Sequence, residues 1–222
     1  FPTRRSSDLI AFCILGSKSL INKLIQRFAA SILLMNQVSA EQALIIHNVK
    51  TVGANVIVDA VAGSGKSTTI LSLAKAMPRQ KIIQLTYNSM LRCEIKQKTE
   101  ELGLDNLDVH TYHSLAVKYY YGSAYTDTGI RHILAHNTAP RIHIPKKDVV
   151  VIDEAHNFVS RIVNKLKVKE SIYYQLYHML MDAQDCRIVM LSGTPIVNYP
   201  NEMGVMYNIL RGYIRTWTFK TN

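Results

Sequence analysis

The residues with the most recognisable chemistry form the run AVAGSGKS at positions 60–67. Glycine at Gly63 and Gly65 lets backbone N–H groups turn inward around a phosphate, and the helix expected to follow points its positive amino-terminal end at the same anion. We expect Lys66 to reach the β- and γ-phosphates and Ser67 to place its hydroxyl on Mg²⁺. The spacing is that of a Walker A loop with alanine at its first position, and it predicts nucleoside triphosphate binding. The loop residues expected at the nucleotide are Ala62, Gly63, Ser64, Gly65, Lys66, Ser67 and Thr68.

A second run, DVVVIDEAH at positions 148–156, is an apolar strand that ends in two adjacent carboxylates. It resembles a Walker B motif, in which Asp153 would hold Mg²⁺ through its water shell and Glu154 would orient or deprotonate the attacking water. An Asp-Glu pair can also cap a helix, but the Walker A loop in the same chain favours catalysis. His156 would sense the γ-phosphate or, alternatively, cap and pack. The predicted catalytic residues are therefore Glu154, Lys66 and Asp153.

The elements that must position these residues alternate along the chain. Strand-like runs are followed by helical patterns, which is typical of a parallel sheet covered by helices. Several of these runs are apolar on both faces, as strands buried between two helical layers must be. The predicted strands lie at 55–60, 81–87, 107–111, 148–155 and 187–195, and the predicted helices at 67–76, 90–102, 114–121, 158–181 and within 198–213. Residues 121–147 are expected to form a surface loop or small insertion.

The fold class predicted from this pattern is α/β, with a central parallel sheet and helices on both faces. The chain has 222 residues, of which 48% are hydrophobic, enough for one domain with a sizeable core. Its formal net charge of +10 favours a polyanionic partner such as nucleic acid, although a solvated basic surface explains the charge equally well. The three cysteines have no paired spacing, which suits a reducing, intracellular compartment and gives no zinc site.

The amino-terminal part requires separate treatment. Residues 1–9, FPTRRSSDL, resemble the translation of a sequencing-adapter oligonucleotide and are left out of the fold prediction. Residues 10–35 are apolar but interrupted by basic residues, so an amphipathic helix is expected rather than a membrane span. We expect the ATP-binding domain at 36–215 and a truncated linker at 216–222. No targeting signal is visible.

With these motifs in place, the sequence resembles the superfamily 1 and 2 helicases and translocases, whose motor is a pair of RecA-like domains. The resemblance implies a RecA-like P-loop NTPase fold, with ATP and Mg²⁺ as cofactors. In superfamily 1 a glutamine upstream of the Walker A loop reads the adenine, and Gln42 stands at close to that spacing. An exposed helical glutamine is the alternative explanation.

Two further runs extend the resemblance. QLTYNSMLRCEI at 84–95 resembles motif Ia of superfamily 1 helicases such as the UvrD-like and F-box DNA helicases, and VHTYHSLA at 109–116 resembles the TxHS element that follows it. In that family both runs line the track of a single nucleic-acid strand. Core packing is the competing explanation for Tyr87 and Tyr112. The residues implied at the strand are Thr86, Tyr87, Asn88, Thr111 and His113.

One run departs from superfamily 1. MLSGTPIVN at 190–198 resembles motif III of superfamily 2, especially of Swi/Snf-type translocases, where the segment links the γ-phosphate to the grip on nucleic acid. The chain is therefore a hybrid by motif, of a kind that resembles helicases of large DNA viruses. The residues implied in coupling are Ser192, Gly193, Thr194 and His156.

The resemblance implies the first motor domain of an ATP-dependent helicase or translocase, acting on single-stranded DNA or RNA, with DNA preferred. Roles in DNA repair or replication, in the nucleus, cytoplasm or a viral factory, would follow. A second RecA-like domain, which supplies the arginine finger, is expected outside this sequence, so the chain alone would hydrolyse ATP slowly. The alternatives are a duplex translocase that does not unwind and a non-catalytic nucleic-acid-binding remnant.

Overall fold

The structure is a computed structural model, which describes residues 11–12, 38–61, 63–120, 127–136, 149–183, 185–194 and 200–211. Within these ranges the strands form one six-stranded sheet in the order β1-β2-β6-β5-β3-β4, and every neighbouring pair is parallel. The strands are β1 (Ala11–Phe12), β2 (Val56–Asp59), β3 (Ile82–Thr86), β4 (Leu107–Thr111), β5 (Val149–Asp153) and β6 (Arg187–Ser192).

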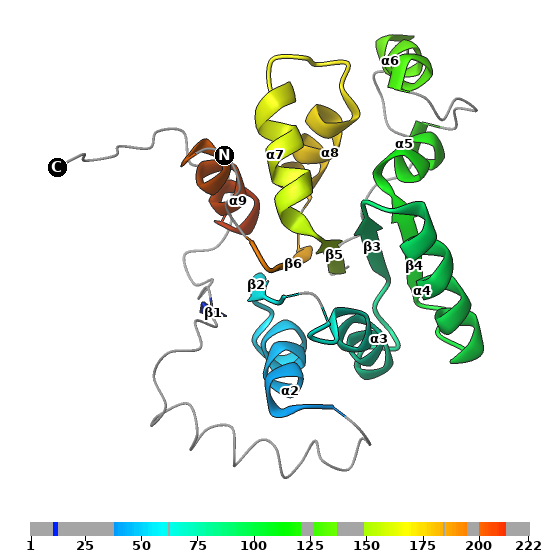
Figure 1. Cartoon of the computed structure of the whole chain (residues 1–222), viewed down its shortest axis with the longest axis vertical. Coiled ribbons are helices and arrows are strands. Elements are labelled where there is room, and N and C mark those ends of the chain that lie inside the picture. Colours follow the sequence, from blue (N-terminus) through cyan, green and yellow to red (C-terminus); the bar gives the residue numbers. More distant parts are fainter. Residues whose placement is uncertain are drawn as a thin grey trace, which may run out of the picture.

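Helices cover both faces of this sheet (Figure 1). One face carries α2 (Ala40–His47), the π-helical turn η1 (Asn48–Val52), α3 (Lys66–Ala76) and α4 (Ser89–Glu101). The other face carries α5 (Tyr112–Tyr120), α7 (Ala155–Lys165), α8 (Ile172–Asp182) and α9 (Pro200–Arg211). A further helix, α6 (Asp127–His136), lies against α5 and α8.

The alternation of side chains along the strands explains why two cores form. In β5, Val150 and Ile152 pack towards α7 and α8, whereas Val149 and Val151 pack towards α3. All four are 0% exposed. A parallel strand covered on both sides needs apolar residues at every position, which is why this run is continuously apolar.

The predicted fold class is confirmed, since the described strands form a parallel sheet with helices on both faces and the arrangement of a RecA-like domain. Each predicted strand is present, and β4 has the predicted bounds at both ends. The prediction of one helix over 158–181 is wrong, because the chain forms α7 and α8 with a break at 166–171. Ser171 accounts for the new start, since its side chain accepts a hydrogen bond from Tyr173 N–H and caps α8.

Two other predicted segments are described only in part. The segment 121–147, predicted as a loop or small insertion, contains α6, and its other residues lie outside the described ranges. Of residues 10–35, predicted as an amphipathic helix, only Ala11 and Phe12 are described, and they form a short strand beside β2. The predictions for residues 1–9 and 216–222 also lie outside those ranges. None of the helices in the described ranges is both long and apolar enough to cross a membrane.

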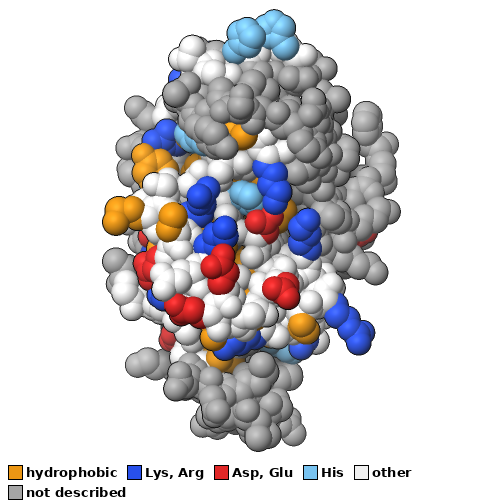
Figure 2. All heavy atoms as spheres, turned by 90° about the vertical axis from the view of Figure 1, so that its right-hand side faces the viewer, with side chains coloured by type: hydrophobic (Ala, Val, Ile, Leu, Met, Phe, Trp, Pro, Cys, Tyr) orange, Lys and Arg blue, Asp and Glu red, His pale blue; other side chains and the backbone are white. Residues whose placement is uncertain are grey.

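The net positive charge is not gathered into one basic patch on the face formed by α4 and β4. Figure 2 shows basic and acidic side chains interspersed there. On α4, Lys98 pairs with Glu94 at 2.6 Å and Lys96 with Glu100 at 3.8 Å. Pairs with this spacing stabilise an exposed helix only weakly.

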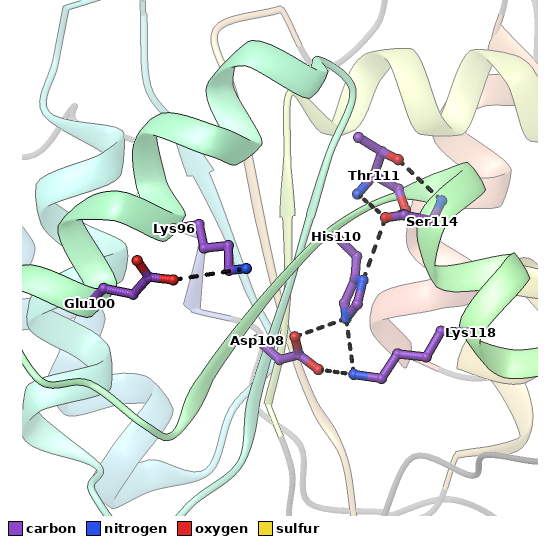
Figure 3. A network of polar contacts seen from close by, with 7 residues as sticks. All are labelled: Lys96, Glu100, Asp108, His110, Thr111, Ser114 and Lys118. Carbon is purple, nitrogen blue, oxygen red and sulfur yellow. Dashed lines mark hydrogen bonds and ion pairs between the residues drawn. The ribbon is translucent and has the colours of Figure 1, made fainter. Parts of the chain in front are cut away.

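A polar network holds the outer strand β4 against α5 (Figure 3). Asp108 Oδ1 lies 2.9 Å from Nε2 of His110, and Lys118 of α5 pairs with the other oxygen of the same carboxylate. His110 Nδ1 lies 3.4 Å from the Ser114 hydroxyl. The hydrogen bond from His110 holds the pKa of Asp108 well below its ordinary value, and Lys118 adds to that effect against the opposing influence of burial.

This network predicts a pH-dependent contribution to stability. Because the pKa of Asp108 is lower in the folded than in the unfolded chain, its contribution is fully present above the unfolded value of about 4 and is lost progressively as the pH falls from there through the lower folded value. We expect Asp108→Asn to lower the melting temperature at pH 7 and the difference from the parent chain to become smaller at pH 3.

Thermal unfolding followed by circular dichroism between pH 7 and pH 3 measures this effect. Glu100→Gln, which also removes a carboxylate from an ion pair but on the exposed face of α4, should change the melting temperature little at any pH. If the difference in melting temperature between Asp108→Asn and the parent chain did not vary with pH, the lowered pKa of Asp108 would be contradicted.

Candidate nucleotide-binding site

The predicted site residues gather at the carboxyl edge of the sheet. Parallel strands all end at this edge, and ligands of open α/β sheets bind there. In sheet order it presents the loop after β2, Ser192 at the end of β6, Asp153 at the end of β5, Thr86 at the end of β3 and Thr111 at the end of β4. Motifs that are far apart in sequence therefore lie in neighbouring strands.

The Walker A loop has the backbone conformation that its glycines were predicted to provide. Gly63 has φ of 80° and Gly65, at the amino-terminal end of α3, has φ of 84°. This left-handed region favours glycine over residues that carry a Cβ. The side-chain amide of Gln42 donates to the carbonyl of Gly65 at 3.4 Å, so the residue predicted to read adenine lies beside the loop. Ala62 lies outside the described residues.

Lys66 and Glu154 are in direct contact. The lysine Nζ lies 2.6 Å from Glu154 Oε1 and also donates to the carbonyl of Ala60 at 3.2 Å. The lysine side chain is 14% exposed and the glutamate side chain 33% exposed. Opposite charges attract more strongly in such a partly desolvated site than in water. The predicted phosphate-binding cation and the predicted base for water are thus close enough to act on one substrate.

Asp153 is buried at the end of β5, with 2% of its surface exposed. Burial raises the pKa of its carboxyl, the charge of Glu154 adds to the rise, and Lys66 opposes it. A bound divalent cation would relieve both unfavourable effects. The donor set fits Mg²⁺, because Asp153 supplies a carboxylate and Ser67, half-buried in the first turn of α3, supplies a hydroxyl.

His156 connects Glu154 to β6. Its Nδ1 lies 3.4 Å from Glu154 Oε2 and 2.9 Å from the hydroxyl of Ser192. That hydroxyl accepts a hydrogen bond from the backbone N–H of Thr194 at 3.2 Å. Four residues predicted to act in catalysis or coupling therefore form one chain of polar contacts.

Gly193 is packed directly against the start of the Walker A loop. A Cβ at this position would lie 3.0 Å from Val61 Cα and 3.2 Å from the carbonyl oxygen of Ala60. The neighbouring carbonyl of Ser192 accepts a hydrogen bond from the N–H of Ala60 at 2.9 Å. The segment after β6 and the start of the phosphate loop are therefore in direct backbone contact.

The residues predicted at a nucleic-acid strand differ in accessibility. Tyr87 is 48% exposed, whereas Thr86 is 1% exposed, so the threonine side chain is not available at the surface. Asn88 is exposed and caps α4 by accepting from Met90 N–H at 2.8 Å. Thr111 exchanges hydrogen bonds with Ser114 at the start of α5, and His113 is half-buried nearby. The predicted strand contact of the Thr86 side chain is therefore wrong, whereas the contacts of Tyr87, Asn88, Thr111 and His113 stay predictions.

For Tyr112 the core-packing explanation is correct. It is 1% exposed, and its ring stacks on Phe158 with centroids 5.0 Å apart. Arg161 of α7, by contrast, was not predicted, although it lies between the phenols of Tyr87 and Tyr173 and donates to both. No local motif marks it, because its position depends on α7 lying beside the segment after β3.

No family model matches the chain. It is 28% identical over 97 residues to a candidate ATP-dependent RNA helicase of Acanthamoeba polyphaga mimivirus, which covers 41% of this chain and 11% of that protein. It is 39% identical over 66 residues to the termination factor NPH-I homolog of African swine fever virus, covering 30% of this chain and 9% of the viral protein. A second candidate RNA helicase of the mimivirus is 34% identical over 88 residues, or 40% of this chain and 17% of the relative.

The matched stretches span 17% or less of these curated relatives. Among solved structures, the helicase domain of Pyrococcus furiosus Hef aligns with a TM-score of 0.48 and 15% identity over 80% of this chain and 36% of that one. A hypothetical ATP-dependent RNA helicase from Sulfolobus tokodaii aligns with a TM-score of 0.47 and 16% identity over 87% of this chain and 56% of that one. The UvrD-like, Swi/Snf-type and adapter-derived features remain predictions from the sequence.

The contact of Gly193 with the loop leads to a prediction for Gly193→Ala. Because the added Cβ would require a backbone to move, we expect the affinity for a fluorescent ATP analogue to fall about tenfold, a loss of about 1.4 kcal/mol. Gly103→Ala is the matched control, since Gly103 has φ of 61° but no neighbouring atom within 4 Å. It should lower stability and leave nucleotide affinity unchanged. Equal affinities for Gly193→Ala and the parent chain would show that this contact does not constrain the loop.

Proposed function

We propose that this chain is the ATP-binding motor domain of an ATP-dependent nucleic-acid helicase or translocase, with DNA as the preferred strand. The observation that carries the proposal is the contact of 2.6 Å between Lys66 of the Walker A loop and Glu154 beside the buried Asp153. The viral relatives with helicase names support the same class of activity.

The roles of the residues follow from their positions. The amides around Gly63 and Gly65 and the ammonium of Lys66 would bind the phosphates, and Gln42 would face the base. Ser67 and Asp153 would hold Mg²⁺, which when bound with ATP screens the phosphate charge and polarises the γ-phosphate. A phosphate at Lys66 would compete with Glu154 for the same ammonium. Glu154, released from that pairing, could then orient a water and accept its proton.

Coupling to nucleic acid would use the segment after β6. His156 contacts both Glu154 and Ser192, while Gly193 lies against the start of the phosphate loop. A change at the catalytic carboxylate would therefore reach this segment through hydrogen bonds and backbone contact. A second RecA-like domain would supply the arginine finger, a contribution of about 10³ to 10⁵ in rate in related phosphoryl-transfer enzymes.

The central test compares three substitutions in the complete gene product. Lys66→Ala should abolish ATPase activity stimulated by single-stranded DNA, because the phosphates lose their cation. Glu154→Gln should keep nucleotide affinity but lower the stimulated rate by about 10² to 10⁴. Lys75→Ala, an exposed lysine of the same helix α3, should behave as the parent. A parent protein whose ATPase responds to neither DNA nor RNA would refute the proposed function.

A duplex translocase that does not unwind is the second candidate. The Ser192–Thr194 segment, which resembles the Swi/Snf-type motif and contacts the phosphate loop, favours it. A strand-separation assay and a triplex-displacement assay on the same protein distinguish the two. For a helicase we expect ATP-dependent strand separation. Triplex displacement without strand separation would instead support the duplex translocase.

A further inference from the structure

Arg161 joins two aromatic side chains from different parts of the chain. Its Nη2 donates to the hydroxyl of Tyr87 at 2.7 Å, and its Nη1 donates to the hydroxyl of Tyr173 at 3.1 Å. The guanidinium carbon also lies 4.9 Å from the ring centroid of Tyr87 and 5.5 Å from that of Tyr173. The planar, five-donor guanidinium is the side chain suited to such a double contact, and lysine could not reproduce it.

The Tyr87 end of this arrangement is open to solvent. Tyr87 is 48% exposed and Met90, the second residue of α4, is 78% exposed. Both lie just beyond the end of β3, at the same carboxyl edge as the phosphate loop. We call these two residues the Tyr87–Met90 platform. An exposed aromatic ring can stack on any nucleobase without reading sequence, and an exposed apolar side chain can add apolar contact.

The opposite end leads to the catalytic carboxylates. Tyr173 meets the ring of Tyr112 edge-on, with centroids 5.9 Å apart, and Tyr112 stacks on Phe158 of α7. The Tyr112 hydroxyl is buried without a hydrogen-bond partner among the described residues. Burial raises its pKa, and the charges of Tyr173, Asp153 and Glu154 add to the rise.

Helix α7 links Arg161 to Glu154. Arg161 is two turns along the helix from Glu154, which immediately precedes α7 with φ of 49° and ψ of 52°. Phe158, Val159 and Ile162 are all nearly or fully buried, so α7 is packed as a rigid body. A displacement of Arg161 would therefore be shared by the start of the helix. The left-handed backbone of Glu154 is a sparsely populated conformation that depends on its surroundings.

We propose that Arg161 is a positioning residue that transmits the occupancy of the Tyr87–Met90 platform by a single nucleic-acid strand to the orientation of Glu154. The inference rests on the proposed function and deepens it, since it names a route by which a strand would stimulate ATP hydrolysis. A strand that stacks on Tyr87 changes the position of its phenol, Arg161 follows through the hydrogen bond of 2.7 Å, and α7 carries the change to its first turn.

The test measures steady-state ATP hydrolysis by the complete gene product against the concentration of oligo-dT. Arg161→Gln should reduce the ratio of strand-stimulated to basal kcat about tenfold, within the range typical of coupling between sites. The strand affinity and the KM for ATP should stay within about twofold of the parent values. Fluorescence anisotropy of labelled oligo-dT gives the strand affinity independently.

Two further variants separate positioning from direct binding and from misfolding. Tyr173→Phe removes the second hydroxyl partner of Arg161 at a residue that is only 5% exposed, and it should reproduce the loss of stimulation without contacting the strand. Lys165→Gln removes a positive charge from an exposed position on the same helix and should keep the parent ratio.

The outcomes distinguish failure of the inference about Arg161 from failure of the proposed function. Full stimulation in both Arg161→Gln and Tyr173→Phe would overturn the inference while leaving the proposed function intact. If a saturating concentration of oligo-dT restored full stimulation to Arg161→Gln, the inference would also be overturned. Arg161 would then contribute only to binding of the strand. A parent protein that shows no stimulation by any strand would refute the proposed function and the inference with it.

Discussion

The pairing of Lys66 with Glu154 is the interaction on which the arrangement of the site depends. The lysine follows β2 and the glutamate follows β5, and β6 lies between these strands. The two side chains meet only because all three strands are parallel and end at one edge, with Asp59 paired to Ser192 and Asp153 paired to Leu191. A register shift by one residue would turn Asp153 to the opposite face of the sheet.

The same arrangement explains how the site can respond to a ligand. Among its contacts, Glu154 forms an ion pair with Lys66 and a contact with His156, and its backbone N–H donates to Asp153 at 3.0 Å. In the proposed function, a phosphate that competed for Lys66 would alter the first of these contacts and thereby the balance of the others. Because α7 starts directly after Glu154, such a change would not be confined to one side chain.

The general fold could be predicted because buried parallel strands have a distinct composition. VVVI in β5 and IVML in β6 are apolar at every position, and turn residues separate them from the helices. The break between α7 and α8 is hard to predict because Leu166 and Val168 keep the segment partly apolar, and Ser171 alone marks the new helix start. Helix α6 was missed because Gly129 and its polar neighbours weaken the helical pattern.

In the candidate site, too, some features could be predicted from the sequence and others could not. Lys66, Ser67 and Asp153 could be assigned because each belongs to a contiguous motif with a known chemical requirement. The burial of Thr86 could not be predicted from the sequence, since it depends on which strand lies beside β3. Arg161 is the clearest case, because its partners Tyr87 and Tyr173 are distant in sequence and only the packing of α7 brings all three together.

The most direct test of the central claim is a crystal structure of this chain with Mg²⁺ and a non-hydrolysable ATP analogue. Our account predicts the triphosphate within the loop around Gly63 and Gly65, with Lys66 transferred from Glu154 to a phosphate oxygen and Mg²⁺ between Ser67 and Asp153. An analogue bound away from this edge, or an unchanged Lys66–Glu154 ion pair beside a bound triphosphate, would contradict it.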